Sequence, residues 1–213
     1  MQGEASTGIA RGRPRDAGKR EAILACAYEL VLRHGYVRVT TAEIARAAGA
    51  GKQTIYRWWP TKAELVLDAL EHWAERSIDL PAKGAPLRDF LTRVCDGATR
   101  AGRVLRSLMA EAQFDDELRA LVKRRLIEPR RDGLRESLRA MGIGPAEDRE
   151  ALMRAIYGSL WYRLLLDEPL DEPFIDAMAR LAKCVARQCA TGQSATTQSA
   201  TGQGAAAQAS SGG

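Results

Sequence analysis

The sequence lacks any long apolar run. Its longest uncharged apolar stretch spans residues 155–162 and ends at Arg163, whereas a membrane-spanning helix needs about 20 apolar residues. The N-terminal residues include arginines but no apolar segment of the kind that forms the core of a secretory signal. We therefore expect neither a membrane-spanning helix nor a secretory signal, and we predict a cytoplasmic location.

Cysteine and histidine are also scarce. The cysteines at positions 26, 95, 184 and 189 show no Cys-x-x-Cys spacing, and the only histidines are His34 and His72. A structural zinc site is therefore not predicted, and the cysteines are interpreted as reduced thiols. Two histidines do not allow a convincing Ser-His-Asp arrangement, and no glycine-rich phosphate loop follows a strand. The sequence thus predicts no enzyme, no catalytic residue, no metal and no cofactor.

Excess charge of one sign is absent from most of the chain. The net charge is +5, and residues 1–65 carry 11 basic and 6 acidic side chains, so the whole excess lies there. The 21 basic and 21 acidic side chains of residues 66–213 balance. A polyanion such as a nucleic acid is therefore expected to bind the first third of the chain.

Both ends of the 213-residue chain are of low complexity. Residues 1–16 are rich in glycine, arginine and small residues, and residues 190–213 repeat a five-residue unit that begins as ATGQS. With no large apolar residue to offset the entropy of ordering, residues 190–213 are predicted to be a disordered tail, and residues 1–16 a disordered basic arm. Between these ends the apolar pattern is helical and no convincing strand occurs, which predicts an all-α fold.

Residues 41–58 have the spacing of a helix-turn-helix motif. Thr40-x-x-Glu43 is a capping box that begins a helix ending near Ala48, and Gly49-Ala50-Gly51 supplies the turn. A second short helix is expected over residues 52–58, because Pro60 ends it. A second capping box, Thr61-x-x-Glu64, then begins a longer helix.

Helical periodicity assigns an inner and an outer face to this motif. Ile44 and Ala48 are expected to face Ile55 and Trp59. Gln53 and Arg57 then point away from Ile55, flanked by Thr54 and Tyr56, with Lys52 at the N-terminal end. Such donors, acceptors and cations are what the reading of base edges in a major groove requires.

The segment from Val39 to Leu65, VTTAEIARAAGAGKQTIYRWWPTKAEL, resembles the DNA-binding domain of the TetR (tetracycline-repressor-like) family. It departs from the family pattern at Gly51, where a capping polar residue is common, and at Trp58. The resemblance implies a homodimeric regulator with an N-terminal three-helix helix-turn-helix domain at 17–60. A C-terminal helical bundle at 61–189 would dimerise and bind an effector.

The resemblance also implies roles for individual residues. Lys52, Gln53 and Thr54 would approach bases, and phosphates would be held by Thr40, Thr41, Tyr56 and Lys62. Arg57 and Trp58 are further candidates for DNA contacts, although Trp58 can equally pack against a neighbouring helix. Tyr36 is expected in the core.

An arginine-rich segment lies before the first helix. Arg11 and Arg13 belong to Arg-Gly-Arg-Pro, which resembles the core of an AT-hook, a slim chain that enters a narrow minor groove. A merely solvated basic tail is the alternative.

The last two helices carry more apolar residues than one buried face needs. We therefore predict that they form a four-helix dimer interface with their symmetry mates, through Leu152, Ile156, Leu160, Phe174, Met178, Leu181 and Val185. A buried central helix in a monomer is the alternative. An effector pocket is predicted among residues that could also be plain core, namely Trp73, Met109, Gln113, Phe114, Tyr157 and Trp161.

The favoured interpretation is an effector-responsive repressor that binds a palindromic operator as a dimer. Its predicted partners are double-stranded operator DNA, a second copy of the chain and an unknown small-molecule effector. The alternative is an architectural DNA-binding protein without an effector. Repression is the default by resemblance, and the sequence does not disclose the operator or the effector.

Overall fold

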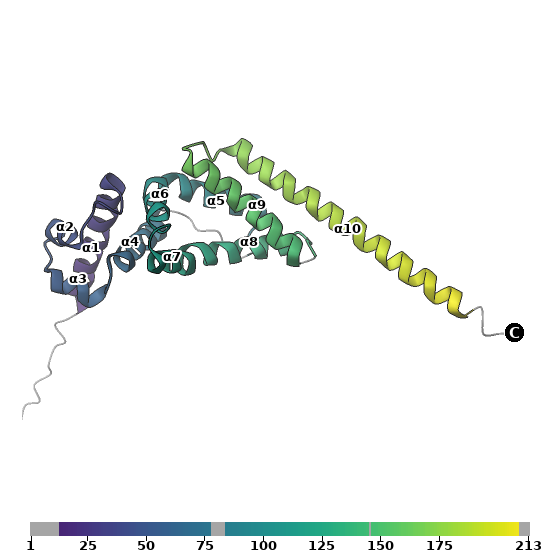
Figure 1. Cartoon of the computed structure of the whole chain (residues 1–213), viewed down its shortest axis with the longest axis horizontal. Helices are drawn as coiled ribbons and strands as arrows, with labels where there is room; N and C mark the ends of the chain where they lie inside the picture. Colours follow the sequence, from purple (N-terminus) through teal and green to yellow (C-terminus); the bar gives the residue numbers. More distant parts are fainter. Residues whose placement is uncertain (1–12, 78–83, 145, 209–213) are drawn as a thin grey trace, which may run out of the picture. The chain divides into compact units, whose positions relative to one another are not determined.

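The computed structural model describes residues 13–77, 84–144 and 146–208, and the regular structure in these ranges is entirely helical (Figure 1). The predicted all-α fold is therefore confirmed. In chain order the helices are α1 (Arg13–His34), α2 (Thr41–Ala47), α3 (Lys52–Trp58), α4 (Lys62–Ser77), α5 (Leu87–Arg100), α6 (Gly102–Glu111), α7 (Asp116–Val122), the π-helical turn η1 (Lys123–Ile127), α8 (Glu128–Ala140), α9 (Ala146–Leu165) and α10 (Glu172–Gln208).

The described chain divides into two compact units. The first unit holds residues 13–77 and 103–122, and the second holds residues 84–102, 123–144 and 146–208. Helix α4 and residues 103–122 thus pack with the three N-terminal helices, so the first unit extends beyond the 17–60 range that the sequence predicts for the DNA-binding domain.

The first unit is built on α1 and α4, which pack along each other. Ile23 and Val31 of α1 and Leu65 of α4 are fully buried. The rings of Tyr28 and Trp73 stack between the two helices, with centroids 4.8 Å apart. This pair of helices is the frame on which α2 and α3 are held.

The second unit packs α5, α8, α9 and α10 together. Leu134 and Leu138 of α8 are fully buried, as is Met153 of α9. Helix α8 approaches α5 closely at Gly133, where an added Cβ atom would lie 2.7 Å from a ring carbon of Phe90. Glycine at this position allows the two helices to meet.

The chain ends differ from the sequence-based expectation. Helix α1 already begins at Arg13, because a proline such as Pro14 is tolerated in the first turn of a helix. Arg11 lies outside the described residues, so the predicted minor-groove arm stays a prediction.

Helix α10 continues through residues 190–208, where the sequence predicts a disordered tail. No proline occurs after Pro173 to stop the helix, and the repeat is rich in alanine, the residue with the highest helix propensity.

Candidate nucleic-acid interface

Helix α2 begins with the capping box that the sequence predicts. The Glu43 N–H donates to Thr40 Oγ1 at 3.2 Å, and the Thr40 N–H donates to the Glu43 carboxylate at 2.8 Å. These hydrogen bonds lower the pKa of Glu43 below its ordinary value. Thr40 is exposed, whereas the side chain of Thr41 is 8% exposed. Thr41 can therefore offer DNA little more than its backbone N–H.

The turn between α2 and α3 depends on Gly49, which has a φ of +60° that L side chains rarely adopt. The Ala50 N–H donates to the Ala45 carbonyl at 2.9 Å and closes the turn. Ile44 and Ile55 are fully buried beside it. The predicted helix-turn-helix packing is present in the structure.

Helix α3 exposes the predicted outer face. Lys52, Gln53 and Arg57 are exposed, Tyr56 is 50% exposed, and Thr54 is half-buried. The N-cap residue Gly51 provides no side-chain hydrogen bond. The surface of α3 thus carries the amide of Gln53, the phenol of Tyr56 and two cations. These are the kinds of group that contact bases and phosphates.

Trp58 is half-buried and makes local contacts. Its ring meets the Trp59 ring edge-on at 5.6 Å, and the Arg57 guanidinium lies 5.7 Å from its centroid. Neither contact removes Trp58 from reach of DNA, so both roles considered for it stay open.

The end of α3 is clamped to α1 and α4. The indole N–H of Trp59, a residue only 3% exposed, donates to Asp68 Oδ2 at 2.7 Å. Arg20 pairs with the same oxygen at 2.8 Å and lies over the Trp59 ring at 5.4 Å. These contacts fix the orientation of α3 on the frame.

The side chain of Lys62 contacts Tyr36. Its ammonium donates to the Tyr36 carbonyl at 3.0 Å and lies 4.0 Å from the centroid of the Tyr36 ring. Tyr36 is 4% exposed, as expected for a core residue. These contacts use one of the three N–H donors of the ammonium, and the predicted phosphate contact by Lys62 stays a prediction.

Sequence reasoning missed a basic hollow beside α2. His34, Arg38 and Arg46 line it together with Leu30, Val39, Glu43 and Ala47, and its volume is about 290 Å³. Arg38 and Arg46 are exposed. The available signal was the presence of basic residues on both sides of the Thr40 cap.

The six residues of the predicted effector pocket are divided between the two units. Trp73, Met109, Gln113 and Phe114 belong to the first unit, whereas Tyr157 and Trp161 belong to the second. Phe114 is 90% exposed, and the Tyr157 hydroxyl donates to the Arg130 carbonyl at 2.9 Å inside the second unit. The pocket therefore stays a prediction.

Four of the residues predicted for the dimer interface are buried within one chain. Leu152, Ile156, Leu160 and Phe174 are each at most 6% exposed within one chain. Leu152, Ile156 and Leu160 lie on α9, which contacts α5, α8 and α10 of the same chain, and Phe174 lies at the start of α10. These side chains therefore expose little surface within one chain. Met178 and Val185 of α10 are half-buried, and Leu181 is 39% exposed.

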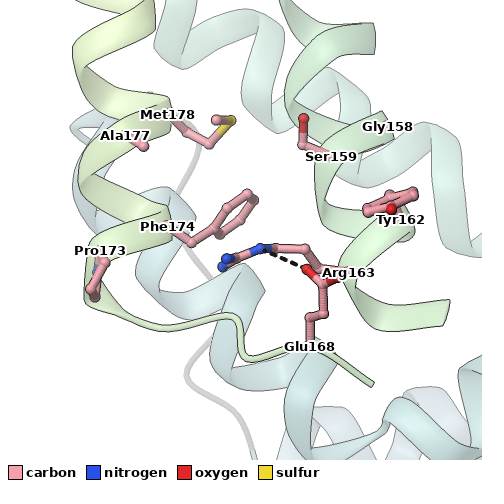
Figure 2. Close-up of a pocket in the computed structure, with 9 residues that line it drawn as sticks. All are labelled: Gly158, Ser159, Tyr162, Arg163, Glu168, Pro173, Phe174, Ala177 and Met178. Carbon is pink, nitrogen blue, oxygen red and sulfur yellow. Dashed lines mark ion pairs between the residues drawn. The ribbon is translucent and has the colours of Figure 1, made fainter. Parts of the chain in front are cut away.

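A hollow of about 530 Å³ lies between α9 and α10 on the second unit (Figure 2). Ser159 and Tyr162 line it from α9, and Met178 from α10. Arg163 pairs with Glu168 at its base, at 3.4 Å. Apolar side chains nearby are exposed, namely Tyr162, Leu165, Leu166 and Leu181.

The part of the chain that the structure describes offers neither a metal-binding group nor a membrane-spanning helix. No group of His, Cys, Asp or Glu residues in the described ranges could hold a metal ion. None of the described helices combines the length and hydropathy that spanning a membrane would require.

Two family models match the chain. The model described as bacterial regulatory proteins of the tetR family matches residues 23–69. The model described as the tetracyclin repressor-like C-terminal domain matches residues 85–182. The first range contains α2 and α3 completely.

Curated relatives and solved structures agree with these models. The chain is 37% identical to the uncharacterized HTH-type transcriptional regulator YdeS of Bacillus subtilis, over 73% of this chain and 83% of that protein. It is 33% identical to the DNA-binding transcriptional repressor TetR of Mycobacteroides abscessus, over 78% and 90%. The crystal structure of the TetR family transcription regulator SCO0332 superposes with a TM-score of 0.60 at 30% identity, over 78% of this chain and 97% of that one.

Proposed function

The chain belongs to the TetR family of bacterial transcriptional regulators, and we propose that it is an effector-responsive repressor that binds a palindromic operator as a dimer. As a member of this family it is a DNA-binding regulator and not an enzyme. Repression is supported by the 33% identical relative, which is itself a repressor.

The observation that carries the proposal is that α3 exposes its outer face while its inner face is buried against the rest of the first unit. Lys52, Gln53 and Thr54 approach base edges in the major groove, while Tyr56 and Arg57 reach flanking phosphates. The structure supports these roles because Ile55 and Trp59 hold the opposite face of α3 in the core. Loss of one good base contact typically costs about 1–3 kcal/mol of discrimination.

Further phosphate contacts come from the basic hollow and the start of α2. Arg38 and Arg46 flank Thr40 and are exposed. Guanidinium groups suit phosphates because they donate two parallel hydrogen bonds. We therefore assign Arg38 and Arg46 to the DNA backbone beside Thr40 and the Thr41 backbone.

The dimer forms through the exposed apolar surface of α9 and α10. Met178, Leu181 and Val185 recur at helical spacing on α10, and Met178 lines the same hollow as Tyr162 of α9. Replacement of Leu181 by glutamate is expected to shift the protein from dimer to monomer in sedimentation, whereas Leu181→Ala retains part of the dimer. A monomeric wild-type protein would contradict this assignment.

The test of DNA binding is a titration of purified protein against the DNA upstream of its own gene, followed by selection of bound genomic fragments. The proposal predicts an inverted repeat with half-sites about 34 Å apart, one turn of DNA, or a multiple of that spacing. Affinity is expected to fall steeply with salt. Equal affinity for random DNA would exclude the repressor and favour an architectural protein.

The effector is tested on the same complex. Small molecules that release the operator in a titration would identify its chemical class, because a ligand shifts the equilibrium only by its differential affinity for the two states. Substitution of Tyr157 and of Trp161 by alanine then asks whether the predicted pocket binds that ligand.

A further inference from the structure

Three basic side chains line the hollow beside α2. His34 ends α1, Arg38 lies in the connection between α1 and α2, and Arg46 lies on α2. All three are exposed, and within the described ranges no hydrogen bond or ion pair joins their side chains to another residue. Arg33 differs, because it pairs with Glu29 at 3.4 Å. Basic groups that gather without an ion pair favour a bound anion.

Glu43 is the one acid among the described residues that line this hollow, and its carboxylate is already in use. One of its oxygens accepts from both the N–H and the hydroxyl of Thr40, each at 2.8 Å. These hydrogen bonds lower the pKa of Glu43 more than the nearby charges of Arg46 and His34 do. A single carboxylate that caps α2 leaves the hollow with an excess of positive charge.

The end of α1 favours a positive charge on His34. This residue lies in the last turn of α1, where the carbonyls of a helix carry partial negative charge. The Gly35 N–H donates to a carbonyl one turn earlier at 2.8 Å, and its φ of +81° ends the helix there. Helices α4 and α6 also approach α1, but none of their described residues lines the hollow. The charged groups that share the hollow with His34 are thus Arg38, Glu43 and Arg46.

The hollow lies beside the start of α2, where the proposed function places the DNA backbone. Arg38 and Val39 come directly before Thr40, the N-cap of α2, and Glu43 follows it by three residues. A DNA strand that passes the start of α2 therefore also passes the hollow. Histidine is the one side chain whose charge normally changes between about pH 5 and 8, and a phosphate beside an imidazole favours its protonated form.

We propose that His34, in its protonated form, binds a DNA phosphate in this hollow together with Arg38 and Arg46, so that DNA binding takes up a proton. The inference rests on the proposed function in its DNA-binding part. Because the proton is bound more tightly in the complex, operator affinity rises as the pH falls through the range in which histidine titrates. The regulator thus holds its operator more tightly under acidic conditions.

Two substitutions fix the charge at this position. His34→Gln is neutral at every pH of the assay, and His34→Lys is positive throughout. With the selected operator duplex as probe, lowering the pH from about 8 to about 5.5 is expected to raise the affinity of wild type about tenfold more than that of His34→Gln. His34→Lys is expected to bind tightly at both pH values.

The salt dependence gives a second readout of the same contact. Each phosphate neutralised by a protein cation contributes about 0.9 to the slope of log K against log salt. The wild-type slope is therefore expected to be steeper at the lower pH by about 0.9 for each protomer, and the slope of His34→Gln to be the same at both.

His72 supplies the matched control, because it is the only other histidine in the chain and lies on α4. His72→Gln is expected to keep the pH dependence of wild type. Equal pH dependence in wild type and His34→Gln, or a wild-type salt slope that does not change with pH, would overturn the proposal. A circular dichroism melt of each variant confirms that it is folded at the assay temperature.

NMR of the imidazole signals separates this inference from the proposed function. A short random duplex supplies DNA phosphates without an operator, and it is expected to raise the titration midpoint of His34 and leave that of His72 in place. Inorganic phosphate at the same concentration of phosphate is expected to raise it far less. Equal affinity for operator and random DNA would refute the repressor and leave this result unchanged. A midpoint that the duplex does not move, or that inorganic phosphate moves more, would refute the role of His34 at DNA.

Discussion

Replacement of Asp68 by alanine tests how α3 is held on the frame. The buried indole N–H of Trp59 loses its acceptor at 2.7 Å, and a buried donor without a partner costs about 1–3 kcal/mol. The ion pair with Arg20 is lost as well, but the Arg20 side chain is 47% exposed, so this adds only about 0.2–1 kcal/mol. We expect Asp68→Ala to lower the free energy of unfolding by about 2–3 kcal/mol.

The matched control is Asp68→Asn, which removes the charge and keeps an oxygen that can accept from Trp59. It is expected to cost less than about 1 kcal/mol, since only the exposed part of the interaction is lost. Urea denaturation followed by tryptophan fluorescence measures both variants, and an unchanged m-value shows that stability alone has changed. Asp68→Ala could instead have a free energy of unfolding within about 0.5 kcal/mol of wild type, or equal to that of Asp68→Asn. Either result would refute the stabilising role assigned to the hydrogen bond between Trp59 and Asp68.

Three further predictions concern packing, pH and thiol reactivity. Gly133→Ala is expected to destabilise the protein by about 1 kcal/mol, because overpacking against the buried Phe90 ring outweighs the gain in helix propensity; chemical denaturation measures it. Because the folded-state pKa of Glu43 is lowered, its contribution to stability is present above pH 4.5 and is lost as pH falls through the folded pKa. Thermal melts at decreasing pH should therefore show a smaller loss of stability in Glu43→Gln than in wild type. Burial raises the pKa of Cys95 to about 12, so alkylation of native protein at pH 8 should label the exposed Cys184 and spare Cys95.

Each of these has a control in the same chain. Gly18→Ala places a Cβ where nothing lies within 4 Å, and it should stabilise α1 slightly. Equal effects of Gly18→Ala and Gly133→Ala would contradict the packing argument. An equal loss of stability with falling pH in wild type and in Glu43→Gln would contradict the contribution assigned to the capping box. Labelling of Cys95 at the rate of Cys184 would show that its site opens readily.

The helix-turn-helix could be predicted from sequence almost residue by residue. Helix α3 spans Lys52–Trp58 as predicted, and α2 ends within a residue of the prediction. The reason is that the signals are local: a capping box, a glycine turn and Pro60 lie within a few residues of the boundaries that they set.

The face of α9 that its own chain covers and the hydrogen-bond partner of Lys62 could not be predicted in this way. A helix with two apolar stripes, such as α9, does not reveal which stripe its own chain covers, and Leu152, Ile156 and Leu160 proved to be core. Similarly, the lysine at the start of α4 is visible in the sequence, but the Tyr36 carbonyl that it binds lies 26 residues earlier. Both depend on contacts between distant segments.

The most direct test of base recognition by α3 is the affinity ratio between the selected operator and a scrambled duplex, measured for wild type and for Gln53→Ala. Base contacts by Gln53 predict that the ratio falls by about tenfold or more, while the matched change Gln188→Ala on the exposed surface of α10 leaves it unchanged. An unaltered ratio in Gln53→Ala would contradict the assignment of the outer face of α3 to the reading of DNA sequence.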